Sequence, residues 1–432
     1  MKTVRLNNLN LKLITIYLVV AAIIIDATSM YRYLTNSPLF DKGFRLPLSM
    51  ICLLYVLQSK SFKVNNAIRI RLPIVMIVLF IYAYVTRSTS DRFLVSYVGA
   101  FFFLFVFAYA LYQNHQMKEF MRAFSNVIII MAVVSLFFWL FGSILHVLPG
   151  RSQLTYYWAE SYRTTYTYYY LYFENPIQNI GHGTICNLGV FTEAPGYSGF
   201  LTYALLIELV FRQSIIGKKN RRKSLFRILI LIITELTTDS TKGIIAVLIA
   251  LTIEYVAKET HNNWRKALKA IVGVAVIVIV AYIGFVLIGN KLETSSGMYR
   301  LDDLRSGFKT FLQHPMFGAG YNNVEAVMRN QLHARSNQGL SMGLTVLLAY
   351  GGLWLSAIYA GAVAASYKIP YFRRNRRTWI LIVCVLFYNL FVSNSAFSST
   401  YIFLIAAAYA APMREVKSLQ TKRVHIKNAA QS

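Results

Sequence analysis

The chain has 432 residues, of which 56% are hydrophobic and only 14% are charged, and its mean hydropathy is +0.48. A soluble domain carries about 25% charged residues, so this composition excludes an ordinary soluble protein and indicates helices that face lipid. The formal charge of +27 does not indicate nucleic-acid binding, because the cations lie between apolar runs and not in a stripe among exposed aromatic residues. The cysteines have no paired spacing, which predicts neither a disulfide framework nor a cysteine metal site.

Apolar runs that approach the length of a membrane span recur along the whole chain. A transmembrane helix needs roughly 20 such residues. The runs begin near Leu13, Phe44, Arg71, Phe93, Ala123, Pro195, Leu225, Gly243, Ala267, Gly339, Trp379 and Ser399. They predict an all-α fold, a polytopic membrane helical bundle of about twelve transmembrane helices with two large outer loops, within a single integral membrane domain over 1–432. The first run is too long for a signal peptide, so we expect it to be retained as a helix.

The cations divide the connections between these runs into two kinds. Most of the 44 lysines and arginines fall in alternate connections, among them the cluster from Lys218 to Lys223. Cytoplasmic loops are enriched in these residues, so the pattern predicts a multi-pass protein of the bacterial inner membrane with both termini cytoplasmic. The same pattern places segments 149–192 and 290–338 on the outer face, and both are too long to be simple connectors.

The first outer segment, 149–192, is rich in tyrosine. Tyrosine and tryptophan combine an apolar ring with a polar edge, which suits both a membrane interface and stacking on sugar rings. The segment is therefore an interfacial aromatic belt, a glycan-binding surface, or both. For the second function, Trp158 and Tyr169 are candidate glycan contacts.

Polar motifs gather at the predicted outer face, whereas the sequence contains no P-loop, zinc-protease, nucleophile-elbow or dinucleotide-binding pattern. Four pieces follow one another along the chain. They are Gly189–Gly196 with Glu193, Thr237–Gly243 with Lys242, Arg300 followed by the His-Pro-x-x-Gly-x-Gly segment His314–Gly320, and Leu332–Gly352 with His333 and Asn337. In this order the pieces resemble the O-antigen polymerase and ligase superfamily, bacterial membrane proteins that polymerise or attach lipid-linked polysaccharides.

The resemblance implies a glycan transfer from undecaprenyl diphosphate to a sugar hydroxyl, without a metal or other cofactor. The departing diphosphate needs fixed cations, which arginine supplies bidentately and lysine as a point charge. Arg300, Lys242 and Arg305 are the candidates for this role. The attacking hydroxyl needs a positioned base, for which His333 and Glu193 are the candidates, and Asn337 is a candidate glycan contact.

The sequence departs from the family's pattern at three positions. The family often shows Phe-x-Glu-Pro where this chain has Glu193-Ala194-Pro195, and Thr-x-Ser-Arg where Lys242 stands near the arginine position. Ligases commonly have histidine directly before asparagine, whereas here Ser336 precedes Asn337 and His333 lies three residues earlier. The last departure favours a polymerase over a ligase.

Each candidate residue also has a simpler explanation. Lys242 could be an interfacial lysine whose ammonium reaches the membrane surface. Arg300 could form a salt bridge with Asp302 or Asp303, Glu193 could be an acid at a helix N-terminus, and His333 could be a solvated loop residue. The sequence leaves these alternatives open.

The interpretation favoured by the sequence is a polysaccharide repeat-unit polymerase of O-antigen, capsule or exopolysaccharide. It would transfer the growing chain to a second lipid-linked repeat unit. The alternatives are an O-antigen-type ligase, or a flippase or other transporter. The expected partners are undecaprenyl-diphosphate-linked oligosaccharides, the lipid bilayer, a chain-length regulator and a flippase, with no nucleic acid. A transporter is expected to show two similar halves, and the sequence has no such repeat.

Overall fold

The computed structural model describes residues 2–27, 29–34, 45–59, 62–87, 90–158, 161–176, 184–211, 221–257, 295–332 and 339–412, and some residues between 262 and 282. Most of this part of the chain is helical. In chain order the α-helices and π-helical segments (η) are α1 (Lys2–Asp26), α2 (Met30–Leu34), α4 (Arg45–Leu57), η1 (Ala67–Arg71), α5 (Leu72–Val85), α6 (Ser90–Phe93), η3 (Leu94–Val98), α7 (Gly99–Gln113), α8 (Met117–Phe138), η4 (Trp139–Ile144), α10 (Ala194–Val210), α12 (Arg221–Thr237), α13 (Thr241–Ala257), α15 (Ser295–Gln313), α16 (Val324–Met328), α17 (Gly343–Tyr367), α18 (Pro370–Arg374), α19 (Arg376–Val392) and α20 (Ser399–Ala410).

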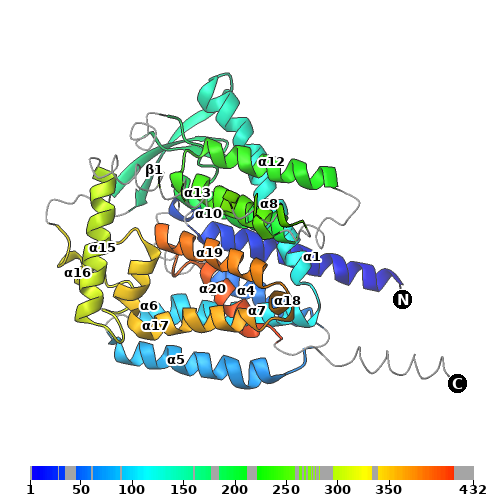
Figure 1. Ribbon diagram of the computed structural model, residues 1–432, viewed down its shortest axis with the longest axis vertical. Helices are drawn as coiled ribbons and strands as arrows, with labels where there is room; N and C mark the ends of the chain where they lie inside the picture. The colour runs from blue at the N-terminus through cyan, green and yellow to red at the C-terminus, as the bar shows by residue number, and fades with distance from the viewer. Residues whose placement is uncertain are drawn as a thin grey trace.

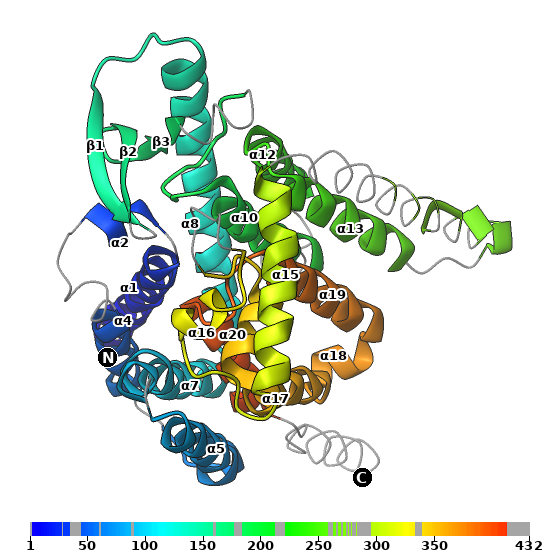
Figure 2. The same ribbon diagram turned by 90° about the vertical axis from the view of Figure 1, so that its left-hand side faces the viewer.

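The long helices share one general direction, and α15 crosses it. In Figure 1, α1, α5, α17 and α19 run from side to side, whereas α15 stands upright at the left edge, across their ends. Figure 2 looks at this edge and shows α15 passing in front of the bundle. The start of α1 and the short helix α18 lie at the opposite end of the bundle. The end that carries α15 is called the α15 end below.

Four helices of the described chain are long and apolar enough to cross a membrane. They are Ala67–Val85, Asp91–Gln113, Met117–Ile144 and Gly343–Tyr367. The expected twelve spans are not confirmed: α10, α12 and α19 coincide with predicted runs but have 17 residues each, or about 26 Å of helix against a hydrocarbon core of about 30 Å. The run predicted from Ala267 lies largely outside the described residues.

A break in α17 joins the His-Pro-x-x-Gly-x-Gly segment to the bundle. Gly352 has non-helical backbone angles (φ 59°, ψ −161°) inside this helix. The loop after α15 supplies backbone partners there: the N–H of Leu353 donates to Pro315 O (2.9 Å), and the N–H of Ala319 donates to Ala349 O (2.8 Å). Irregular backbone at membrane depth needs such partners from the protein itself. The His-Pro-x-x-Gly-x-Gly segment thus completes a broken span.

The all-α expectation requires one correction, because segment 149–192 contains a three-stranded antiparallel sheet in the order β1 (Arg151–Trp158), β2 (Ser161–Tyr168) and β3 (Tyr172–Glu174). Alternating β-branched and aromatic residues favour strands. Several of its aromatic rings are buried and hold the sheet against α2 and α8: Tyr156 and Phe173 pack on Met30, and Tyr168 and Tyr172 pack on Phe138. Much of the tyrosine content therefore forms a small core.

Candidate active site

Glu193 stands at the N-cap of α10, in extended backbone (φ −145°, ψ 145°). The segment before it is tied to the start of α2, where the N–H of Met30 donates to Val190 O (2.8 Å). The Glu193 side chain makes no capping hydrogen bond, so it does not act as a simple helix cap. Burial raises the pKa of the Glu193 carboxyl, and the positive charges of Arg163 on β2 and Arg300 on α15 oppose that rise.

Lys242 lies in the first turn of α13 and points into the protein. Its side chain is buried, with 5% of the residue exposed. The ammonium donates to the backbone carbonyl of Pro195 on α10 (3.1 Å) and to the Ser393 hydroxyl just after α19 (3.2 Å). Gly199 leaves room for it, since a Cβ there would lie 3.2 Å from Lys242 Nζ. The alternative of a lysine that reaches the membrane surface is therefore wrong.

Glu235, near the end of α12, is the acid that faces this lysine. It is 1% exposed, and its charge interacts with that of Lys242. Its carboxylate occupies the space beside Gly243, where a Cβ would lie 1.5 Å from Glu235 Oε1 and 2.4 Å from Ser198 Oγ. Only a glycine at this position leaves room for the carboxylate. The turn between α12 and α13 thus brings a buried acid and a buried base together.

Arg300, in the second turn of α15, is the residue that joins these groups. It is partly buried, and its charge interacts with Glu193 at the start of α10 and with Lys242 at the start of α13. It also interacts with Tyr388 on α19. Helix N-termini carry partial positive charge and bind anions. Two cations and two helix N-termini therefore create a positive region at the α15 end.

Asp302 and Asp303 bind other groups and do not form the salt bridge with Arg300 that the sequence left open. The backbone N–H of Leu332 donates to the Asp302 carboxylate (3.3 Å), and the N–H of Ser341 donates to Asp303 Oδ2 (2.8 Å). Among the described residues no ion pair joins Arg300 to either acid. The two acids instead fix the chain on both sides of 333–338 to α15.

The remaining predicted residues divide into three groups. His333 and Asn337 lie outside the described residues. Arg305 is on the exposed face of α15. Trp158 ends β1, opposite Ser161 and near the Arg163 end of the hairpin, whereas Tyr169 follows β2 at the other end, about 20 Å away along the strand. The structure therefore places Arg300 within electrostatic reach of Lys242 and Glu193, whereas Tyr169 lies at the far end of the hairpin and Arg305 on the exposed face of α15.

Sequence reasoning missed Glu235 and Arg163. The sequence has several acids in or near apolar runs, and nothing in the spacing distinguishes Glu235 from them. The structure does: Glu208 pairs with Arg227 (2.8 Å) and Asp26 with Arg45 (3.2 Å), whereas no ion pair within 4 Å involves Glu235 among the described residues. The short α12–α13 connection, with glycine directly after Lys242, was the available signal.

These features define a helical membrane protein with a buried, cation-lined site at one end of its bundle. Residues 226–343 match a family model described as O-antigen ligase. The match runs from α12 through α13, α15 and α16 to the first residue of α17, and includes Lys242 and Arg300 but not Glu193. It confirms the predicted resemblance to the O-antigen polymerase and ligase superfamily. No curated protein and no solved structure matched the chain.

Proposed function

We propose that the chain is a polysaccharide repeat-unit polymerase that acts at the outer face of the bacterial inner membrane. It transfers glycan from undecaprenyl diphosphate to a second lipid-linked repeat unit. The observation that carries this proposal is the electrostatic interaction of Arg300 with both Lys242 and Glu193, three residues that lie near the starts of three different helices. The placement of α15 and the start of α1 at opposite ends of the bundle supports an outward site with a cytoplasmic N-terminus.

The reaction explains why cations are needed. The acceptor hydroxyl oxygen forms a bond to the anomeric carbon of the donor, and the bond from that carbon to the phosphate oxygen breaks. The electron pair leaves with undecaprenyl diphosphate, whose growing negative charge Arg300 and Lys242 stabilise. Because Lys242 is held by two hydrogen bonds inside the protein, its charge is in place before the substrate binds. We expect no metal and no nucleotide sugar.

The hydroxyl proton passes to a base. Glu193 is suited to this role because its raised pKa makes it a stronger base than an ordinary carboxylate. It also shares the electrostatic environment of Arg300. His333 is the second candidate, and the described residues on both sides of its segment are anchored to α15 by Asp302 and Asp303. The two candidates separate by substitution: if His333 is the base, His333→Ala should remove most activity and Glu193→Gln should reduce it less, and the reverse ranking would assign the base to Glu193.

The test is polymerisation of a purified lipid-linked repeat unit by the reconstituted protein, read as a ladder of chain lengths. Arg300→Ala should leave the protein in the membrane and abolish long chains. Arg300→Lys should be nearly as inactive, because lysine cannot form the bidentate contact. The control is Arg329→Ala, which removes an exposed arginine after α16. Normal ladders from both Arg300 variants would remove Arg300 from the site and with it the proposal.

The alternative functions give different products in the same system. A ligase would place finished glycan on a non-repeat acceptor such as lipid A, so both acceptors should be supplied together. A flippase would move the lipid-linked oligosaccharide across the vesicle without lengthening it. The family description, O-antigen ligase, is the observation that keeps the ligase as the second candidate.

A further inference from the structure

Helix α15 has its polar and apolar faces reversed with respect to a helix on a water-soluble surface. Its buried positions hold Asp302, Asp303, Ser306 and Thr310, each 4% exposed or less. Its exposed positions hold Leu301 (50%), Leu304 (37%), Phe308 (53%) and Leu312 (61%). A helix in contact with water places apolar residues inward and polar residues outward. The outward face of α15, which also carries Arg305 and Lys309, therefore has a stripe of leucine and phenylalanine that favours an apolar surrounding.

The inward polar face is held to the rest of the protein by hydrogen bonds, which fix the rotation of the helix. Asp302 and Asp303 bind the backbone of Leu332 and Ser341, and the amide of Asn330 donates to the Thr310 hydroxyl (3.0 Å). Close packing at Gly307, where a Cβ would lie 2.8 Å from the Cβ of Thr345 on α17, fixes the rotation of the helix. The outward apolar face is thus a permanent feature of the fold.

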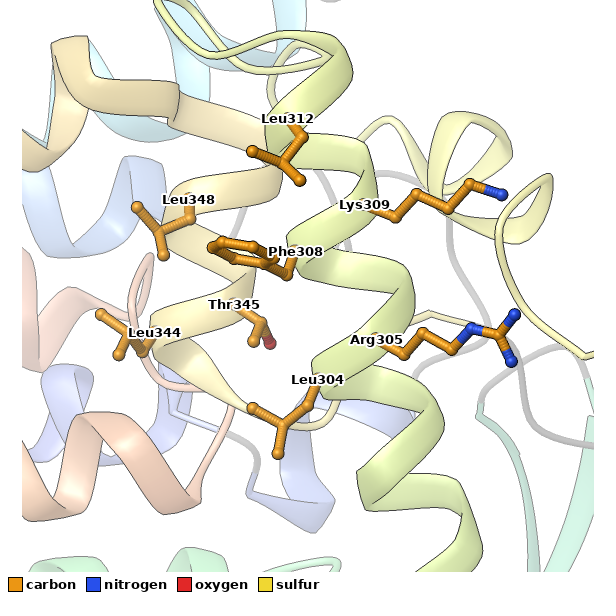
Figure 3. Close-up of a pocket in the computed structure, with 8 residues that line it drawn as sticks. All are labelled: Leu304, Arg305, Phe308, Lys309, Leu312, Leu344, Thr345 and Leu348. Atoms are coloured by element: carbon orange, nitrogen blue, oxygen red, sulfur yellow. The ribbon is translucent and has the colours of Figure 1, made fainter.

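A groove connects this face to a helix that crosses the membrane. Leu304, Phe308 and Leu312 of α15 face Leu344 and Leu348 of α17 across a groove of about 670 Å³ (Figure 3). Helix α17 is a candidate membrane span, and its outward surface must meet lipid. The groove therefore continues a lipid-contacting surface from the span onto α15, which lies across the bundle end (Figures 1 and 2).

Two cations lie beside the apolar stripe of α15. Arg305 and Lys309, one turn apart on the exposed face of α15, extend away from the apolar groove residues and from α17 (Figure 3). An interfacial helix buries leucine and phenylalanine among the acyl chains and keeps lysine and arginine near the headgroups. The charge pattern of α15 matches this arrangement.

We propose that α15 lies flat in the outer leaflet of the bilayer, and that the groove between α15 and α17 holds an acyl chain of an anionic phospholipid. Arg305 and Lys309 bind the phosphate of that lipid. Much of the segment predicted as an outer loop, 290–338, is then part of the membrane-contacting surface, and Arg305 binds bilayer lipid instead of the diphosphate of a substrate.

The test of depth uses the full chain in vesicles of phosphatidylcholine and phosphatidylglycerol. Single cysteines replace Phe308 or Leu312 in a Cys384→Ala background, since the other two native cysteines are buried, and each carries an environment-sensitive fluorophore. The control site is Glu325 on α16, an exposed polar position. We expect blue-shifted emission at both test sites, and quenching by lipids brominated about 5–10 Å below the headgroups. Glu325 should be quenched by aqueous iodide instead.

Two results would overturn this placement. Iodide quenching at Phe308 and Leu312 equal to that at Glu325 would show that water covers the face. Blue-shifted emission without quenching by brominated lipid, together with disulfide cross-links between two copies of the Leu312→Cys variant, would show that a second copy covers the apolar face. Neither result depends on polymerase activity, so this proposal and the proposed function can fail separately.

The phosphate contact has its own test. The double variant Arg305→Gln/Lys309→Gln should bind phosphatidylglycerol about 10- to 30-fold more weakly in detergent, since each cation near an anionic lipid strengthens binding several-fold. Arg329→Gln is the matched control, and binding of phosphatidylcholine should not change. Unaltered phosphatidylglycerol binding by the double variant would refute the assignment of these two cations.

Discussion

Gly352 is a position where a single added methyl group should be costly. Its backbone (φ 59°, ψ −161°) lies in a region that only glycine adopts easily. A Cβ there would lie 2.4 Å from Gly318 N and 2.6 Å from Met316 O, which are backbone atoms that cannot rotate away. We expect about 1–3 kcal/mol from the backbone strain and about 1–3 kcal/mol from the overpacking. Gly352→Ala should therefore cost about 2–6 kcal/mol of unfolding free energy.

Gly339 supplies the matched control. It also has a positive φ, +94°, but nothing lies within 4 Å of its Cβ position. Gly339→Ala should therefore cost only the backbone term, about 1–2 kcal/mol. The difference between the two variants isolates the contact between α17 and the loop that follows α15.

The measurement is equilibrium unfolding of the purified protein in mixed micelles of increasing denaturing-detergent content. Total stabilities of folded proteins are about 5–15 kcal/mol, so Gly352→Ala should shift the transition strongly or reduce the yield of folded protein. A Gly352→Ala variant no less stable than Gly339→Ala would show that the loop does not pack into the break of α17.

Three further predictions concern the site and its orientation. Lys242→Met should lower the melting temperature, because the hydrogen bonds of the ammonium to Pro195 O and the Ser393 hydroxyl are lost, and it should abolish the polymer; normal polymer from this variant would remove Lys242 from the chemistry. Burial raises the pKa of Glu193 in the folded protein. Ionisation of this carboxyl therefore destabilises the folded state once pH exceeds the ordinary value of 4.5. Glu193→Gln should therefore raise the melting temperature at neutral pH, and its difference from the wild type should vanish as pH falls through 4.5. A difference that grows on acidification would show that the Glu193 pKa is lowered and not raised. A cysteine in place of Asn323 should react with an impermeant maleimide in intact cells, and labelling only after permeabilisation would overturn the orientation.

The sequence predicted the helices well because their signal is local. An apolar run of sufficient length needs no tertiary information to be read, and helices lie at the predicted runs from Leu13 to Pro195. The sheet was missed although its signal is local too: Ser161–Tyr168 alternates threonine with aromatic residues, which favours a strand. The segment was interpreted only by its tyrosine content, and that content is equally typical of a membrane interface.

The sequence named Arg300, Lys242 and Glu193 as candidates, but it could not predict how their side chains are arranged. Lys242 was a candidate diphosphate ligand, and the alternative was a lysine at the membrane surface, because an isolated lysine at the end of a span usually reaches water. Its two acceptors come from α10 and from the residue after α19, and its counter-charge comes from α12. These elements are far apart in the chain, so no local pattern indicates that they enclose one ammonium group. The same limit applies to Glu235, whose role depends on the space left by Gly243.

The order of the family's motif pieces has a physical basis in this fold. The Lys242 piece and the Arg300 piece supply the two cations of one site, which neither could form alone. The His314–Gly320 piece has a structural role: its backbone fills the break in α17 at Gly352, and α15 directly precedes it. A change in this piece would move α15, and with it Arg300, relative to Lys242. The glycines and Arg300 are therefore coupled through position, although they lie within about twenty residues of each other and belong to different pieces of the motif.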